Sequence, residues 1–107
     1  MKAAIYARSA IKNDDLLMAQ IDSCIEYLKS CPIPVQEYGC FSELCSSEVP
    51  LRERPAFSRV LNLCMERAVK VIVVDELTRL TRSDKELLEL ISKLSEFGVQ
   101  LLTVDYN

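Results

Sequence analysis

Four short runs of apolar residues, separated by three longer segments with helical periodicity, constrain the fold of this chain more than any other feature. Val69–Val74 is the clearest run, because its β-branched side chains are typical of a strand covered on both faces. The other runs are Ala3–Ala7, Ile33–Tyr38 and Val99–Val104. This alternation predicts an α/β fold of βαβαβαβ order, with a mainly parallel four-stranded sheet and helices on both faces. A chain of 107 residues forms one domain, residues 1–107.

The starts of the three helices can be assigned from capping signals. Asn13 or Asp14 can cap the first helix, and Pro55 suits the first turn of the second. Ser83 followed by Glu86 has the pattern of a capping box and opens the third. The inward faces predicted from the helical period are Leu17, Ile21, Cys24 and Leu28, then Phe57, Val60, Leu61, Cys64 and Ala68, then Leu87, Leu90, Ile91 and Leu94.

Residues 40–53, between the second strand and the second helix, show no periodicity and contain several serines. We therefore predict a long loop there. Loops of this length in a small domain are often functional or mobile.

The composition excludes several classes of function. The chain has no histidine, which removes Ser-His-Asp, Cys-His and histidine-nuclease chemistry. The net charge of −3 argues against a surface that coats DNA regardless of sequence. No apolar run approaches the ~20 residues of a membrane span. The five cysteines have no C-x-x-C spacing, so we expect no metal site and reduced core thiols in a cytoplasmic protein: Cys24, Cys31, Cys40, Cys45 and Cys64.

Arginines follow three of the predicted strands. In a parallel sheet every strand-to-helix connection leaves from the carboxyl edge, where open α/β sheets bind ligands. A planar guanidinium matches two phosphate oxygens at once and stays charged, so the pattern predicts an anion site at this edge. The residues concerned are Arg8 with Ser9 in the first connection, Arg52 and Arg54 in the second, and Arg79 and Arg82 in the third.

Four short motifs resemble the catalytic domain of serine recombinases, the resolvase/invertase and large serine integrase family. Ala4–Ser9 is similar to the Y-x-R-x-S strand of that family, and Gln20-Ile21 to its helix motif around a glutamine. Arg54–Phe57 matches the R-P-x-F entry to the second helix, and Val73–Arg82 resembles the L-D-R-L-x-R block. The order of the motifs makes the combination specific, and the resemblance covers nearly the whole chain.

The resemblance implies a DNA recombinase in which a serine attacks a phosphodiester. The serine becomes linked to a 5′ end and a 3′ hydroxyl is released, without a metal or other cofactor. Carried over by position, Arg8, Arg54, Arg79 and Arg82 bind the scissile phosphate, while Glu43 and Gln20 are supporting residues. The resemblance also implies a long dimer helix and a DNA-binding region beyond residue 107. We therefore expect this chain to bind DNA weakly, and the full-length protein to be a dimer or tetramer.

Two positions depart from the family pattern. Aligning on Arg8 puts Ala10 at the position of the nucleophile, one residue after Ser9, and Thr78 stands where the family has an aspartate. Ser9 is the candidate nucleophile. The alternative is a domain that has lost activity, by decay or by an engineered change to Ala10, and serves as a regulatory or protein-interaction module.

Other readings fit the sequence less well. A receiver-type signalling domain also has an aspartate after its third strand, here Asp75, but needs an acidic pair where Arg8 and Ser9 stand. A nucleotide-binding domain would have a glycine-rich first turn, which is absent. Tyr6 is predicted to be a packed strand residue, and no pattern supports Cys40 or Cys45 as a nucleophile.

Overall fold

The sheet consists of four parallel strands in the order β2-β1-β3-β4, in a computed structural model that describes residues 1–105. The predicted fold class and the alternating order are confirmed. The strands are β1 (Lys2–Ser9), β2 (Glu37–Leu44), β3 (Val71–Val74) and β4 (Gln100–Thr103), and the helices are α1 (Asp14–Ser30), α2 (Pro55–Met65) and α3 (Asp84–Glu96). Two short 3₁₀ turns, η1 (Leu51–Glu53) and η2 (Leu77–Arg79), precede α2 and α3.

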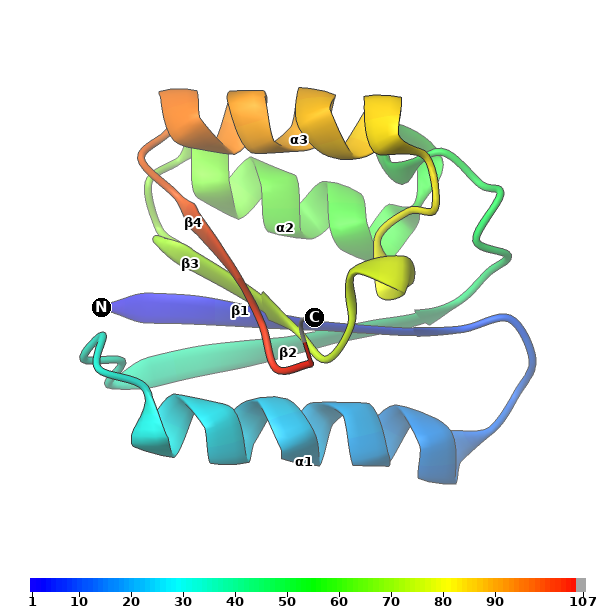
Figure 1. Cartoon of the computed structure of the whole chain (residues 1–107), viewed down its shortest axis with the longest axis horizontal. Helices are drawn as coiled ribbons and strands as arrows, with labels where there is room; N and C mark the ends of the chain where they lie inside the picture. Colours follow the sequence, from blue (N-terminus) through cyan, green and yellow to red (C-terminus); the bar gives the residue numbers. More distant parts are fainter. Residues whose placement is uncertain (106–107) are drawn as a thin grey trace.

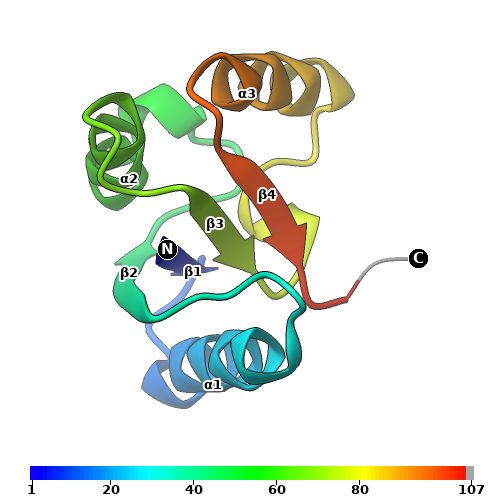
Figure 2. The same ribbon diagram turned by 90° about the vertical axis from the view of Figure 1, so that its left-hand side faces the viewer.

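The helices form two layers around the sheet. Helix α1 covers one face, and α2 and α3 lie together on the other (Figures 1 and 2). Successive side chains of a strand point to opposite faces, so each strand contributes to two cores. Ala3, Ile5, Val71 and Val73 pack with Cys24 and Leu28 on the α1 side. The core on the other side contains Ala4, Tyr6, Ile72, Val74, Phe57, Val60, Cys64, Leu90 and Leu94. No helix within the described residues is long and apolar enough to cross a membrane.

The helix caps agree with the sequence except at one carboxylate. Asn13 caps α1 by accepting a hydrogen bond from the Leu16 amide at 3.0 Å, and Ser83 caps α3 by accepting one from the Glu86 amide at 3.2 Å. The second half of the predicted capping box is wrong. Glu86 Oε2 instead accepts from the Leu51 amide at 3.0 Å, and this bond ties η1 to the start of α3.

The second strand lies later in the sequence than its apolar pattern predicts. The predicted run was Ile33–Tyr38, whereas β2 covers Glu37–Leu44 and pairs residue by residue with β1. As an edge strand, β2 has one half-buried face and one exposed face, so it carries serine, cysteine and glutamate instead of an apolar run. The predicted loop over residues 40–53 is therefore shorter and begins after Leu44.

The cysteines do not all belong to the core, as the composition led us to expect. Cys24 and Cys64 are buried, Cys40 is exposed, and Cys31 and Cys45 are partly exposed. All five are free thiols. The two buried cysteines act as small apolar residues at helix–sheet contacts.

Shortening Leu94 should destabilise the domain, because this side chain is 1% exposed in the core between α3 and the sheet. We expect Leu94→Ala to lower the free energy of unfolding by about 3 kcal/mol, measured by urea denaturation. Leu88→Ala on the same helix is the matched control, since Leu88 is 68% exposed, and should change stability by less than about 0.5 kcal/mol. Equal losses in the two variants would contradict the packing of α3 described above.

Candidate active site at the carboxyl edge of the sheet

Arginines from three separate segments meet at one backbone carbonyl. The carbonyl of Arg79, in η2, accepts hydrogen bonds from Arg8 Nε at 3.0 Å and from Arg54 Nη1 at 2.8 Å. Arg8 comes from β1 and Arg54 directly precedes α2. The connections that follow β1, β2 and β3 leave on the same side of the sheet (Figure 1). The gathering of Arg8, Arg54 and Arg79 that the sequence predicts is therefore present.

Arg54 is a fully buried cation, with 0% of the residue exposed. Its guanidinium donates to the carbonyls of Val49 at 2.9 Å, Ser47 at 3.2 Å and Arg79, and to the Tyr6 hydroxyl at 3.3 Å. Within the described residues no carboxylate forms an ion pair with it. A buried charge is tolerated only when its donors are satisfied, and here backbone carbonyls do most of this.

Glu43 compensates the charge of Arg54 through a tyrosine. The Tyr6 hydroxyl donates to Glu43 Oε2 at 2.6 Å while accepting from Arg54. The Glu43 carboxylate also accepts from the amides of Ala56 and Phe57, at 2.9 and 3.2 Å, so it stabilises the N-terminus of α2. Burial, and then the hydrogen bond to Glu43, raise the pKa of Tyr6 well above its ordinary value. Tyr6 is a packed strand residue, as predicted.

Gln20 fixes the backbone of Arg8. Its amide oxygen accepts from the Arg8 N–H and its amide nitrogen donates to the Arg8 carbonyl, both at 3.0 Å. The Arg8 guanidinium donates to the carbonyls of Cys45 at 3.0 Å and Thr78 at 2.9 Å. Burial, and then the charge of Arg54, lower the pKa of Arg8. Gln20 thus anchors the end of β1 to α1, while the Arg8 side chain extends toward η2.

The Ser9 hydroxyl is engaged in a local turn. Ser9 is the last residue of β1 and is 4% exposed. Its hydroxyl donates to the Ile11 carbonyl at 2.6 Å and accepts from the Ile11 amide at 3.3 Å. Because side chains alternate along a strand, Ser9 lies on the α1 face, whereas Arg8 reaches across the other. In this arrangement the hydroxyl does not contact the three arginines.

The structure does not bring Arg52 and Arg82 into this cluster. Both are exposed, and Arg52 forms only a 3.8 Å ion pair with its neighbour Glu53. Arg82 has no hydrogen-bond or ion-pair partner among residues 1–105. It lies in the short segment between η2 and α3.

Sequence reasoning missed the role of Asp75, which it considered only as an aspartate of a receiver-type domain. Asp75 binds the Arg79 guanidinium with both oxygens, at 2.8 and 3.1 Å, and Glu76 adds a single bond at 3.2 Å. The hydrogen bond from Asp75 is the main cause of the raised pKa of Arg79. An i,i+4 Asp–Arg spacing was visible in the sequence, but such pairs are also common on solvent-exposed helices.

Neither Cys40 nor Cys45 has an activated thiol. Burial raises the pKa of Cys40 and is also the main reason why the pKa of Cys45 is raised. A reactive cysteine needs a lowered pKa, because the thiolate is the nucleophile. The structure therefore gives no support to cysteine chemistry at this edge.

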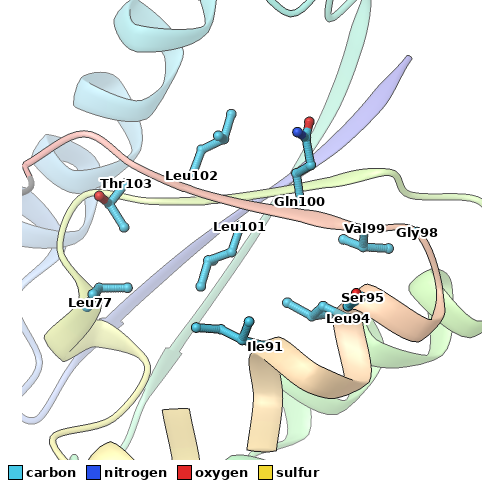
Figure 3. Close-up of a pocket in the computed structure, with 10 residues that line it drawn as sticks. All are labelled: Leu77, Ile91, Leu94, Ser95, Gly98, Val99, Gln100, Leu101, Leu102 and Thr103. Carbon is cyan, nitrogen blue, oxygen red and sulfur yellow. The ribbon is translucent and has the colours of Figure 1, made fainter. Parts of the chain in front are cut away.

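An apolar groove of about 670 Å³ lies between α3 and β4 (Figure 3). Leu77, Ile91, Leu94 and Leu101 are among its lining residues. The helical period places Ile91 inward, but it is 45% exposed, because β4 is the edge of the sheet here and no further strand among residues 1–105 covers it. The groove shares no lining residue with the arginine cluster.

Removing the Tyr6 hydroxyl should destabilise the site. In Tyr6→Phe both Glu43 and Arg54 lose a hydrogen-bond partner in a buried position, so we expect a loss of about 1–3 kcal/mol in the free energy of unfolding. Tyr38→Phe removes a hydroxyl from a residue that is 46% exposed, and should change stability by less than about 0.5 kcal/mol. Urea denaturation at neutral pH compares the two. A Tyr6→Phe protein as stable as Tyr38→Phe would contradict the Glu43–Tyr6–Arg54 connection.

The raised pKa of Tyr6 also predicts a dependence of stability on pH. Tyrosine in an unfolded chain loses its proton from about pH 10, whereas folded Tyr6 still holds it. This group's contribution to stability is therefore full below about pH 10 and falls by up to about 1.4 kcal/mol per pH unit above it. Urea denaturation between about pH 9.5 and 11.5 should show a shallower decline for Tyr6→Phe than for the wild-type chain. Parallel declines would mean that another group titrates.

Comparisons with known proteins agree with this fold. The sequence model of the family described as "Resolvase, N terminal domain" matches residues 3–107. A comparison with curated protein sequences gives no match.

Solved structures of recombinase catalytic domains resemble the whole chain. The N-terminal catalytic domain of TP901-1 integrase superposes with a TM-score of 0.83 at 26% identity, covering 97% of this chain and 78% of that one. The C-terminal catalytic domain of ISC1926 TnpA, an IS607-like serine recombinase, gives 0.79 at 26% identity over 100% of this chain and 69% of that one. A serine recombinase from Sulfolobus solfataricus gives 0.76 at 22% identity, over 99% and 69%, and shows the shared fold. The chain therefore belongs to the resolvase N-terminal domain family and is a catalytic domain of the site-specific serine recombinase type.

Proposed function

We propose that this domain cuts and rejoins DNA, holding the scissile phosphate among Arg8, Arg54, Arg79 and Arg82. The observation that carries the proposal is the shared carbonyl of Arg79, which keeps the guanidiniums of Arg8 and Arg54 within hydrogen-bond distance of one atom. Such a concentration of cations at the carboxyl edge of a parallel sheet suits a dianionic transition state. Arg82, exposed at the same edge, would complete the set when DNA is bound.

The proposed reaction is a transfer of the phosphoryl group from one oxygen to another. The Ser9 oxygen attacks phosphorus, the bond from phosphorus to the 3′ oxygen breaks, and that oxygen leaves with a proton as a 3′ hydroxyl. The phosphate remains joined to Ser9 and to the 5′ end, so the reverse attack by a 3′ hydroxyl rejoins DNA without ATP. Each arginine positioned for the transition state would contribute about 3–4 kcal/mol, by analogy with an oxyanion-hole donor.

The arginines of the cluster have donors available for a phosphate. A guanidinium has five N–H groups. Arg8 uses one bond from each of its three nitrogens, all to backbone carbonyls. The Arg79 Nη1 has no partner within residues 1–105. A phosphate can therefore bind the unused N–H groups first, and replace carbonyls of the 45–50 segment as it settles.

Catalysis by Ser9 requires a local change. Its hydroxyl must give up both bonds to Ile11 and turn toward the arginines. The residues that follow, Ala10 to Asn13, are exposed and outside regular structure, so the turn can rearrange without disturbing the sheet. The hydrogen bonds from Gln20 would hold Arg8 in place meanwhile.

The same Ser9 contacts favour a second candidate function. If the turn at residues 9–11 persists when DNA is bound, the Ser9 hydroxyl does not face the phosphate and forms no covalent bond with it. The domain would then be catalytically inactive and act as a regulatory or protein-interaction module. The presence of Ala10 at the position of the family's nucleophile is consistent with this alternative.

The partners and setting belong to the same proposal. The resemblance assigns the main grip on DNA, and assembly into a dimer or tetramer, to regions beyond residues 1–107. The domain alone would bind DNA weakly, in keeping with its net charge of −3. The proposed location is cytoplasmic, in line with the cysteine pattern of the sequence.

A search for a covalent protein–DNA species tests the proposal. The domain is fused to a heterologous DNA-binding module and incubated with a supercoiled plasmid that carries paired target sites. Denaturing gels and mass spectrometry then detect an adduct in the wild-type chain, Ser9→Ala and Ala10→Ser. We expect an adduct that maps to Ser9 and is lost in Ser9→Ala.

The other outcomes separate the candidates. An adduct seen only in Ala10→Ser would mean that the arginine cluster is competent but the nucleophile is missing, and would overturn the role of Ser9. No adduct in any variant, with retained binding of the fusion to its plasmid, would favour the non-cutting module.

A further inference from the structure

Asp75 occupies a position that the sheet fixes firmly. It is the first residue after β3, whose last residue, Val74, pairs with Thr103 of β4. The Asp75 carbonyl also accepts a hydrogen bond from the Asp105 amide at 2.8 Å. The backbone of Asp75 is therefore held on the sheet side, while its carboxylate extends to the turn η2.

The carboxylate holds Arg79 by one edge. Asp75 Oδ1 accepts from Arg79 Nε at 2.8 Å and Oδ2 accepts from Nη2 at 3.1 Å. The two side chains are 16% and 20% exposed, so solvent screens this pair less than a surface pair. Two parallel bonds to a planar guanidinium fix its orientation as well as its position. With that edge occupied, Nη1 is the donor left for a phosphate.

The residue that Asp75 holds also organises the other two arginines. The Arg79 carbonyl accepts from Arg8 and Arg54, and the carbonyl of the preceding Thr78 accepts from Arg8 Nη2 at 2.9 Å. These carbonyls can serve both guanidiniums only while η2 keeps its present path. The Asp75–Arg79 ion pair spans this turn, because Asp75 directly precedes its N-cap, Glu76, and Arg79 is its last residue.

We propose that Asp75 is the positioning residue of the arginine cluster: by anchoring Arg79, it fixes the turn whose carbonyls set the spacing of Arg8 and Arg54. This role rests on the proposed function, since the cluster is there to hold a phosphate. An acidic residue beside a phosphate site repels the ligand unless its charge is already paired, and both oxygens of Asp75 are paired with Arg79. Asp75 thus takes the task of orienting arginines that Thr78 cannot perform, because threonine has no charge.

The test reads the arginine side chains directly in the 107-residue chain. Nuclear magnetic resonance resolves the side-chain N–H signals of buried arginines, which are assigned with Arg8→Lys and Arg54→Lys. We expect Asp75→Asn to accelerate solvent exchange of the Arg8 Nε–H and Arg54 Nη1–H groups by about tenfold or more, because their shared acceptor, the Arg79 carbonyl, becomes mobile. Glu76→Gln is the matched control, since it removes the same charge from a residue that contacts Arg79 by one bond and has a side chain 45% exposed. It should change these rates by less than about twofold.

A short DNA duplex at low salt serves as the phosphate probe in the same samples. Titration should show an affinity about tenfold lower in Asp75→Asn than in Glu76→Gln. Unchanged exchange at Arg8 and Arg54 overturns the role of Asp75. Faster exchange together with a DNA affinity equal to that of Glu76→Gln also overturns this role, because Asp75 would then support the fold without supporting the phosphate site. If the duplex does not change the arginine signals of the wild-type chain, the proposed function is contradicted. The exchange rates alone then decide whether Asp75 positions the arginines.

The backbone amide spectrum shows whether Asp75→Asn folds. If it does not fold, a second variant tests the proposal. Arg79→Gln keeps the carbonyl at position 79 but removes the ion pair, so it should accelerate exchange at Arg8 and Arg54 in the same way. Exchange rates at Arg8 and Arg54 that are the same in Arg79→Gln as in the wild-type chain contradict the proposal. Where both variants fold, the double variant should match Arg79→Gln alone, because Asp75 acts through Arg79.

Discussion

The buried charge of Arg54 is the constraint on which the rest of the site depends. A guanidinium with no exposed surface needs an acceptor for nearly every N–H group. Here the acceptors are carbonyls of the 45–50 segment, the carbonyl of Arg79 and the Tyr6 hydroxyl. Satisfying one cation therefore fixes the path of two connections and joins them to β1. The charge is balanced at a distance, through Tyr6, by Glu43 of β2, whose carboxylate also accepts from the Ala56 amide at the start of α2.

This arrangement links stability to function through the same hydrogen bonds. The carbonyls that satisfy Arg8 and Arg54 occupy donors that a phosphate would use. In the bonds to loop carbonyls only the guanidinium is charged, whereas in a bond to a phosphate both partners are charged, so the exchange is favourable in direction. Arg79 differs, because its bonds to Asp75 are charge-assisted and bidentate. It is therefore the fixed member of the cluster, around which the other two arginines are arranged.

Much of the fold followed from periodicity, but β2 did not. The fully covered strands β1 and β3 have continuous apolar runs, and α1 and α3 begin at recognisable caps. Strand β2 lies at the edge with one exposed face, so its polar composition resembles that of a loop. The predicted hydrogen bond of the Glu86 carboxylate within a capping box was wrong for a related reason. A capping box is a local pattern, and the local pattern does not reveal that the Leu51 amide, 35 residues earlier, offers a competing donor.

The order of strands and helices follows from the sequence, and with it the gathering of Arg8, Arg54 and Arg79 at one edge. Topology dictates this, because parallel strands all end on the same side. The folded structure was needed to show which groups those arginines bind, that Arg82 stands apart, and that Asp75 holds Arg79. It was also needed to show that the Ser9 hydroxyl faces Ile11. The contacts of Arg8 and Arg54 join segments far apart in the chain, and side-chain patterns along one segment carry no information about them. Those of Asp75 and Ser9 are local, but they depend on the path of a turn that the residue pattern does not specify.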